Sequence, residues 1–257
     1  MEVAIVSAVA LFASILTFFS GFGLGTILTP VMAIFFPVEV AIALTGVVHF
    51  TNNIFKLYLV RTDVSRPVLI RFGVPAVLTS FAGAFLLTAI TGMPVLFRYT
   101  LGGSTFEVLP VNLVIAILLI VFAALDLTPK FKKLEFGNDK MVYGGLLSGF
   151  FGGLTGIQGA LRSAFLIKAG LSKESYIATG VAIAVVIDIS RLSVYSTRFV
   201  DADLRDNLPL LIAAVLSAMT GAILGKRLLK KVTLDAVHSI VAVMLIVIGV
   251  LLGMGII

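Results

Sequence analysis

Long runs of hydrophobic residues, separated by short polar stretches, cover almost the whole chain. They predict helices near residues 3–20, 26–36, 39–60, 67–91 and 108–127 in the first half, and near 141–158, 160–170, 174–197, 207–225 and 234–256 in the second. Most of these runs are long enough to cross the hydrocarbon core of a bilayer. Backbone groups in lipid must bond to each other, and polar and apolar residues alternate too little for barrel strands, so we expect the crossings to be helices.

Two glycine-rich stretches interrupt the apolar runs. The first reads SGFGLGTILTP (residues 20–30), and the second reads GGLTGIQGALRSAF (residues 152–165). The apolar segment after each break is too short to cross a membrane, and three longer segments follow it. We interpret each break as a broken or re-entrant helix pair.

The order of segments is the same in the two halves, which indicates an internal repeat. A shift of 134 residues places Gly25 on Gly159, and a shift of 138 places Gly83 on Gly221. The only hydrophilic connection of any length is TPKFKKLEFGNDK, residues 128–140. We therefore expect a first membrane repeat over residues 1–127, a cytoplasmic linker over 128–140 and a second membrane repeat over 141–257.

The composition agrees with a membrane protein, since 60% of the 257 residues are hydrophobic and only 12% are charged, with a mean hydropathy of +1.16. Soluble domains carry about twice that share of charged residues. The net charge of +6 does not indicate nucleic-acid binding, because the basic residues stand in short clusters between apolar segments. Such clusters are typical of cytoplasmic loops. We therefore expect a lipid bilayer, and no nucleic acid, as a partner.

Three basic clusters predict the orientation. They lie at residues 61–71, in the linker and at residues 226–231, and the positive-inside rule places all three in the cytoplasm. The broken region 141–170 must then return to the side on which it began, as a re-entrant hairpin or a pair of crossings. The acidic loop around Asp201 is external, although its counterpart at 61–71 is internal. We therefore expect inverted repeats, with both termini outside.

The first break has the features of an anion site. Its glycines, Gly21 among them, let the backbone approach a ligand closely, Thr26 stands where an N-cap would begin the short helix 26–36, and Pro30 falls in the first turn. The free N–H groups and the positive end of the helix dipole would face the membrane interior and attract an anion. We expect substrate contacts from Gly23, Gly25, Thr26 and Thr29.

The second break repeats this design and adds a charge. Arg162 takes the place of Leu28 in the repeat, and an arginine near the middle of a membrane is costly, which favours a functional role as the partner of an anion. The alternative is a structural pair with Asp188. We expect substrate contacts here from Thr155, Gln158, Gly159, Arg162 and Ser163. The glycines spaced by four before the break, Gly145, Gly149 and Gly153, are better explained by close contact between helices.

A stripe of polar residues follows the first break on one helical face, at positions 45, 49, 52, 53 and 56. Asn52 and Asn53 are candidates for neutral contacts with a substrate. His49 is either a proton carrier or a hydrogen-bonded structural residue, and Lys56 either lines a cavity or extends to the membrane surface. We group His49 and Lys56 with Asp188 and Arg191 as gating or coupling residues.

The corresponding helix of the second half carries Asp188, Arg191 and Tyr195 on one face. The first two predict an internal ion pair, and a gate that breaks and reforms is the more specific alternative. The chain contains no cysteine and only His49 and His238, and no set of residues suggests a metal site or a nucleophile with its base. We therefore expect neither an enzyme nor a cofactor.

Together, GFGLGTILTP before PVEVAIALTG, the second break with GLS and TG after it, and the basic midpoint loop resemble the TauE/SafE family of sulfite and sulfonate exporters. The resemblance covers nearly the whole chain. It implies an all-α integral membrane protein that moves small anions, such as sulfite, thiosulfate or sulfonates, through the inner membrane of a bacterium or archaeon. In place of GIQGALRSAF, family members commonly have a further glycine and a proline.

Inverted repeats with broken helices are typical of secondary transporters, whose substrate site lies near the midplane of the membrane. We therefore expect a small anionic substrate and alternating access around a site between the two breaks. A channel shares part of this pattern, and a proton- or cation-coupled carrier of another small solute, with Asp188 as its ligand, is the alternative. The sequence leaves open whether two copies form a homodimer.

Overall fold

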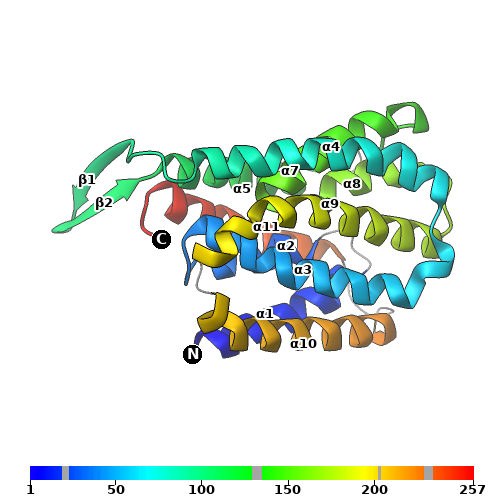
Figure 1. Ribbon diagram of the computed structural model, residues 1–257, viewed down its shortest axis with the longest axis horizontal. Helices are drawn as coiled ribbons and strands as arrows, with labels where there is room; N and C mark the ends of the chain where they lie inside the picture. The colour runs from blue at the N-terminus through cyan, green and yellow to red at the C-terminus, as the bar shows by residue number, and fades with distance from the viewer. Residues whose placement is uncertain (19–22, 129–134, 202–203, 229–233) are drawn as a thin grey trace.

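The structure is a computed structural model that describes residues 1–18, 23–128, 135–201, 204–228 and 234–257 (Figure 1). The first half contains α1 (Glu2–Thr17), α2 (Leu24–Met32), α3 (Val38–Val60), α4 (Arg66–Ile90) and α5 (Pro110–Leu127). The second half contains α7 (Met141–Thr155), α8 (Gly159–Leu166), α9 (Lys173–Asp201), α10 (Leu204–Leu228) and α11 (Leu234–Gly253). Short 3-10 turns, Arg61–Asp63 and Asn138–Lys140, precede α4 and α7. The predicted order of long and short helices is confirmed.

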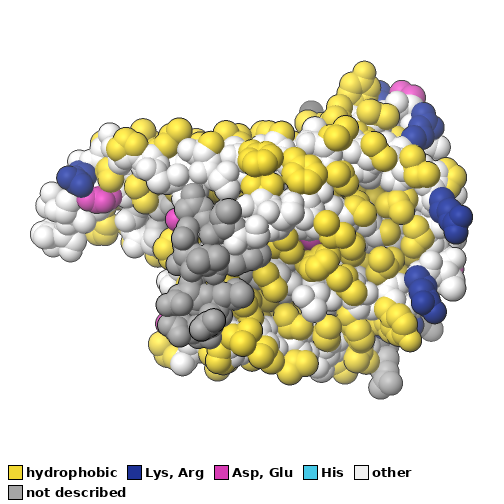
Figure 2. All heavy atoms as spheres, in the orientation of Figure 1, with side chains coloured by type: hydrophobic (Ala, Val, Ile, Leu, Met, Phe, Trp, Pro, Cys, Tyr) yellow, Lys and Arg dark blue, Asp and Glu magenta, His cyan; other side chains and the backbone are white. Residues whose placement is uncertain are grey.

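Among the described residues, four helices are long and apolar enough to cross a membrane, over Val38–Asp63, Arg66–Ile90, Lys173–Ser196 and Asn207–Lys226. Shorter apolar helices lie at Glu2–Thr17, Pro110–Leu125 and Val241–Gly253. Hydrophobic side chains are spread over much of the described part of the visible face (Figure 2). An apolar exterior of this extent matches lipid rather than water as the surrounding solvent. The all-α membrane fold is confirmed.

A small β-hairpin between α4 and α5 departs from the predicted all-helical pattern. Strands β1 (Phe97–Leu101) and β2 (Ser104–Val108) pair antiparallel and project from the end of the bundle (Figure 1). Gly102 and Gly103 form its two-residue turn with φ of 60° and 85°, a conformation that favours glycine. The hydroxyl of Tyr99 donates to the carbonyl of Met254 at 2.7 Å, which ties the hairpin to the end of α11.

Helices from the first half of the chain pack mainly against helices from the second half. Helix α1 packs against α10, α4 against α7, α3 against α9, and α5 against α11 (Figure 1). The contact of α4 with α7 is close because a Cβ added at Gly145, Gly149 or Gly153 would lie within 2.3, 2.1 and 2.1 Å of α4 carbonyl oxygens. The interpretation of these three glycines as contact positions between helices is confirmed.

The same packing between the halves relates the glycines that the repeat aligns. A Cβ on Gly83 of α4 would lie 2.0 Å from the Phe150 carbonyl oxygen of α7, and one on Gly221 of α10 would lie 2.3 Å from the Leu11 carbonyl oxygen of α1. Gly83 therefore contacts the second half through α7, and Gly221 makes the equivalent contact with the first half through α1. This pattern is the one that a twofold relation between the halves requires, and the inverted orientation of the repeats stays a prediction.

The second break returns to the end of the molecule from which it starts. Phe136, before α7, stacks on Phe165 of α8 with ring centroids 4.4 Å apart and donates its N–H to the Ala164 carbonyl at 3.0 Å. Lys168 pairs with Glu135 at 3.1 Å. At 1.5 Å per residue, α7 is about 22 Å long and α8 about 12 Å, each shorter than the hydrocarbon core. Helices α7 and α8 therefore form a helical hairpin, and its re-entrant placement in a membrane stays a prediction.

The two ends of the bundle differ in charge. Lys and Arg side chains gather at the end where α3 joins α4, whereas both termini and the β-hairpin lie at the other end (Figures 1 and 2). This separation agrees with the predicted orientation, in which the basic end is cytoplasmic. Parts of the predicted basic and acidic loops, at 129–134, 202–203 and 229–233, lie outside the described residues, as does Gly21.

Candidate functional site

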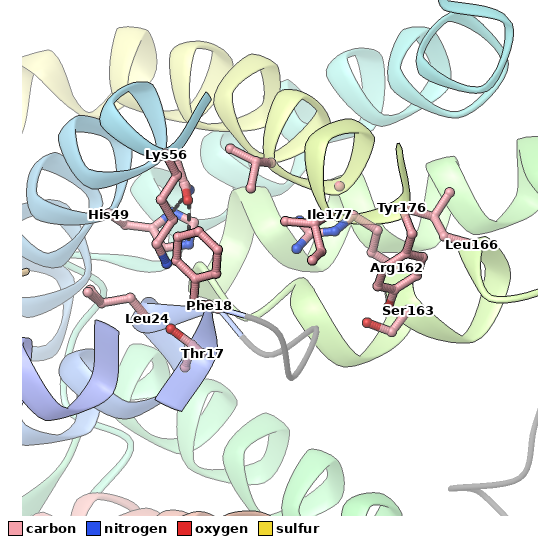
Figure 3. A pocket seen from close by; sticks show the side chains of 14 residues that line it. Thr17, Phe18, Leu24, His49, Lys56, Arg162, Ser163, Leu166, Tyr176 and Ile177 are labelled. Carbon is pink, nitrogen blue, oxygen red and sulfur yellow. Dashed lines mark hydrogen bonds between the residues drawn. The ribbon is translucent and has the colours of Figure 1, made fainter. Parts of the chain in front are cut away.

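A pocket lies where the two breaks approach each other, and its empty volume of about 500 Å³ includes the space open to solvent at its mouth. Five segments from both halves enclose it: the end of α1, the start of α2, the second half of α3, α8 and the start of α9. Figure 3 shows His49 and Lys56 on one side and Arg162, Ser163 and Tyr176 on the other. The full lining comprises Thr17, Phe18, Gly23, Leu24, His49, Asn53, Lys56, Arg162, Ser163, Leu166, Tyr176, Ile177, Gly180 and Val181.

Two basic side chains face this pocket without an acidic partner. Lys56 and Arg162 are 4% and 8% exposed, and no carboxylate in the described part of the chain lies within ion-pair distance of either. Arg162 donates to the Oε1 atom of Gln158 at 3.4 Å, and the Lys56 ammonium lies 5.4 Å from the centroid of the Phe18 ring. Lys56 therefore points into the cavity rather than to the membrane surface.

Behind the pocket lies a buried network centred on Asp188. Its Oδ1 atom accepts from Arg191 Nε at 2.9 Å, and its Oδ2 atom lies 2.6 Å from His49 Nδ1. The Asn53 amide donates to the same Oδ2 at 3.3 Å. Asp188 and Arg191 are fully buried and do not line the pocket. The predicted ion pair is confirmed, and it excludes the alternative in which Asp188 pairs with Arg162.

Glycines create the space in which these side chains sit. Gly156 ends α7 with φ of +78°, and a Cβ there would lie 2.5 Å from Arg191 Nη1. The left-handed conformation and the nearby guanidinium both require glycine at this turn. A Cβ on Gly25 would lie 3.3 Å from the Gly156 carbonyl oxygen, so the start of α2 touches the second break directly.

The start of α2 differs from the prediction. The helix begins at Leu24 with Gly23 as its N-cap, and it ends at Met32 rather than at residue 36. Thr26 is therefore the third helical residue instead of the N-cap, and Pro30 lies in the second turn instead of the first. A glycine N-cap is nearly as favourable as a threonine one, so residue preferences could not locate the start. The N-terminus still faces the pocket through Gly23 and Leu24.

Six of the predicted site residues line the pocket: Gly23, His49, Asn53, Lys56, Arg162 and Ser163. Others lie close behind it. Asn52 turns toward α1, where its Oδ1 accepts from Ser14 at 3.4 Å, and the Thr155 hydroxyl bonds within its own turn, to the Phe151 carbonyl at 2.9 Å. The predicted residues that the structure does not bring to the pocket wall are Gly25, Thr26, Thr29, Asn52, Thr155, Gln158, Gly159, Asp188 and Arg191.

Apart from Arg191, three of the predicted residues outside the wall carry buried polar atoms without a hydrogen-bond partner among the described residues. They are Thr29 Oγ1, Asn52 Nδ2 and Gln158 Nε2. An unpaired buried polar atom costs about 1–3 kcal/mol, so such atoms are rare unless a ligand or water bonds to them. All three lie on helices that border the pocket, on or next to the breaks.

The α9 side of the pocket was missed. Tyr176, Ile177, Gly180 and Val181 line it, and Gly180 leaves room for Arg162, whose Nε would lie 3.5 Å from a Cβ there. The signal was present in the sequence, because residues 176, 180, 184 and 188 follow each other at intervals of four and so share one helical face. Stepping back four residues at a time from Asp188 toward the start of α9 therefore identifies Gly180 and Tyr176 on that wall.

Comparison with known proteins agrees with the earlier resemblance. The family model described as sulfite exporter TauE/SafE matches residues 6–252. No curated protein and no solved structure matches the chain. The family match covers both breaks, all ten described helices in whole or in part, and every residue of the pocket. The chain therefore belongs to the TauE/SafE family of sulfite exporters, which are membrane transporters of anions.

Proposed function

We propose that this protein exports a small divalent sulfur oxoanion, sulfite or thiosulfate, by alternating access around the pocket between the breaks. The observation that supports the proposal is the pair of buried cations, Lys56 and Arg162, without a carboxylate partner in the described part of the chain. Buried charges are paired in proteins unless a ligand supplies the opposite charge.

The valence of the substrate follows from the charges around the pocket. Asp188 and Arg191 balance each other in one ion pair. Lys56 and Arg162 then contribute two positive charges that repel each other at low dielectric. A divalent anion compensates both, whereas a monovalent sulfonate leaves one uncompensated. For this reason sulfite and thiosulfate fit the pocket better than sulfonates do.

The walls of the pocket favour a compact anion. Leu24, Leu166, Ile177 and Val181 supply apolar surface, and Asn53 and Tyr176 supply groups that donate hydrogen bonds to oxygen. The N-terminus of α2 adds backbone N–H groups at Gly23 and Leu24. A small oxoanion fills such a mixed site with few unsatisfied groups.

A second hollow lies between the pocket and the basic end of the bundle. It has an empty volume of about 680 Å³ and is lined by Phe18, Leu59, Val60, Asp63, Lys173, Glu174, Ile177 and Lys226. Because Phe18 and Ile177 line both hollows, these two side chains form the partition between them. With the basic end in the cytoplasm of a bacterium or archaeon, this hollow lies on the cytoplasmic side of the pocket, and displacement of Phe18 and Ile177 would admit an anion for export.

The alternative, a cation carrier with Asp188 as its ligand, has less support. Both carboxylate oxygens of Asp188 already have cationic or polar partners, and the side chain is fully buried behind the pocket wall. A cation entering this pocket would meet Lys56 and Arg162 first.

The test is anion binding and flux in purified protein and in proteoliposomes. Thiosulfate, sulfite and sulfate should each raise the unfolding temperature in detergent more than chloride or taurine does, and thiosulfate flux should exceed that of empty liposomes. Arg162→Gln should weaken thiosulfate binding at least tenfold, because a charge-assisted hydrogen bond contributes about 1.5–3 kcal/mol. Arg71→Gln, an exposed arginine on α4, is the matched control and should change nothing.

Three results would contradict the proposal. Unchanged thiosulfate affinity in Arg162→Gln would show that this residue does not bind the anion. Equal stabilisation by monovalent and divalent anions would show that the site does not select a divalent charge. Absence of flux in the wild-type protein for all three oxoanions overturns the substrate class.

A further inference from the structure

His49 stands between the pocket and the buried ion pair. One ring nitrogen, Nδ1, lies 2.6 Å from Asp188 Oδ2. The other, Nε2, faces the N-terminus of α2, since a Cβ on Gly23 would lie 3.2 Å from it, and the ring lines the pocket (Figure 3). The imidazole therefore bridges a carboxylate on one side and the substrate pocket on the other.

The protonation of this ring follows from its partners. Asp188 is held ionised by Arg191, whose Nε and Nη2 lie 2.9 and 2.8 Å from Oδ1. A carboxylate only accepts hydrogen bonds, so Nδ1 must carry a proton toward it. In the neutral ring Nε2 then has no proton and acts as an acceptor, and the Asn53 amide nitrogen lies 3.3 Å from it.

An unprotonated Nε2 presents a lone pair to the pocket, and a lone pair repels an oxoanion. A protonated Nε2 donates a hydrogen bond to the oxoanion and adds a positive charge beside it. The anion and the proton therefore bind better together than either does alone.

We propose that His49 Nε2 is a proton-binding site that is filled together with the anion, so that the transporter moves the two as a pair. The inference rests on the proposed function, since it assigns the co-transported ion at the same pocket. One proton binds with each divalent anion, so the anion and the proton together carry a single negative charge.

The charged groups around His49 explain why the proton needs the anion. Arg191 faces it from α9 beside Asp188, Lys56 faces it from its own helix, and Arg162 faces the pocket from α8. Tyr176 of α9 is the other titratable side chain on the pocket wall, whereas the described residues of α1 and α2 add only uncharged groups. Two cations disfavour a third one in the empty pocket, and a bound divalent anion reverses that balance.

The experiment measures proton uptake when an anion binds. Thiosulfate is the probe, because sulfite itself takes up a proton near neutral pH and thiosulfate does not. Wild-type protein in weakly buffered detergent, with a pH indicator, should take up about one proton per bound thiosulfate at mildly alkaline pH. By the same linkage the thiosulfate affinity should fall about tenfold for each unit of pH above neutrality.

Variants identify the residue that takes the proton. His49→Gln should still bind thiosulfate, with no proton uptake and a flat dependence of affinity on pH. Lys56→Arg keeps a charge that cannot be released, so each thiosulfate that it binds should still bring about one proton with it. Uptake that persists in His49→Gln, or disappears in Lys56→Arg, overturns the assignment to His49.

A spectroscopic measurement covers the case in which His49→Gln fails to fold. The chain has two histidines, so the His238→Gln variant labelled with nitrogen-15 histidine reports on His49 alone. Thiosulfate should convert the ring from the neutral form to the imidazolium form. If thiosulfate binds and the ring stays neutral, the proton site is wrong while the anion site stands; if no oxoanion binds, the proposed function itself fails.

Discussion

Replacing Asp188 by asparagine removes a fully buried carboxylate at the centre of the bundle. Its two oxygens contact Arg191 at 2.9 Å, His49 at 2.6 Å and Asn53 at 3.3 Å, and both Asp188 and Arg191 are fully buried. The variant leaves the Arg191 guanidinium charged and without a counter-ion. Breaking a buried pair in this way costs about 3–5 kcal/mol.

That loss is large enough to measure in detergent. For a chain of this size 1 kcal/mol corresponds to roughly 2–4 °C in the unfolding temperature, so Asp188→Asn should unfold roughly 6–20 °C below the wild type. Unfolding followed by circular dichroism, together with titration with a denaturing detergent, gives the shift and the free energy of unfolding. The lower stability should appear with and without an anion, because Asp188 does not line the pocket.

A double-mutant cycle separates the ion pair from general damage. Arg191→Met alone leaves Asp188 unpaired and should cost a similar amount, whereas Asp188→Asn combined with Arg191→Met removes both charges. The loss in the free energy of unfolding of the double variant should be at least about 2 kcal/mol smaller than the sum of the losses in the two single variants. Such a coupling lies within the range of roughly 0.5–3 kcal/mol for residues in contact. Additive losses, or a single loss below about 1 kcal/mol, would refute the reasoning.

Three further predictions concern glycines and orientation. Gly149→Ala should lower the free energy of unfolding by about 1–3 kcal/mol because its Cβ would lie 2.1 Å from a carbonyl oxygen of α4, whereas Gly73→Ala, with 3.5 Å of room, should not. Gly156→Ala should reduce thiosulfate flux in proteoliposomes, because φ of +78° strains alanine and its Cβ displaces the buried guanidinium. In this cysteine-free chain, an impermeant maleimide should label Thr100→Cys in intact cells, and Thr62→Cys only after permeabilisation; the reverse pattern contradicts the orientation.

The breaks and the charged residues were accessible from the sequence because both are costly in a membrane. An apolar run interrupted by glycines needs a reason, and so does Arg162 within such a run. The His49 and Lys56 positions followed from helical spacing alone. The inference from these residues to an anion site did not depend on knowing how the helices are arranged.

Other features could not be predicted, for identifiable physical reasons. The partners of each helix were hidden because lipid-facing and buried faces are both apolar, so periodicity does not distinguish them. Asn52 was assigned to the substrate although its Oδ1 bonds to Ser14 of α1, a contact across 38 positions of the chain. The β-hairpin was overlooked although its Gly102-Gly103 turn, between alternating residues, is a recognised hairpin signal.

The packing of helices between the halves has a consequence for how the molecule is divided. Helices α4 and α7 touch backbone to backbone at successive glycines, so they must shift as one rigid body, and α1 with α10 forms the corresponding pair. Each body combines one helix from the first half of the polypeptide with one from the second half. A cut in the linker would therefore yield two fragments with exposed glycine faces, each of which completes its fold only by threading its helices between those of the other.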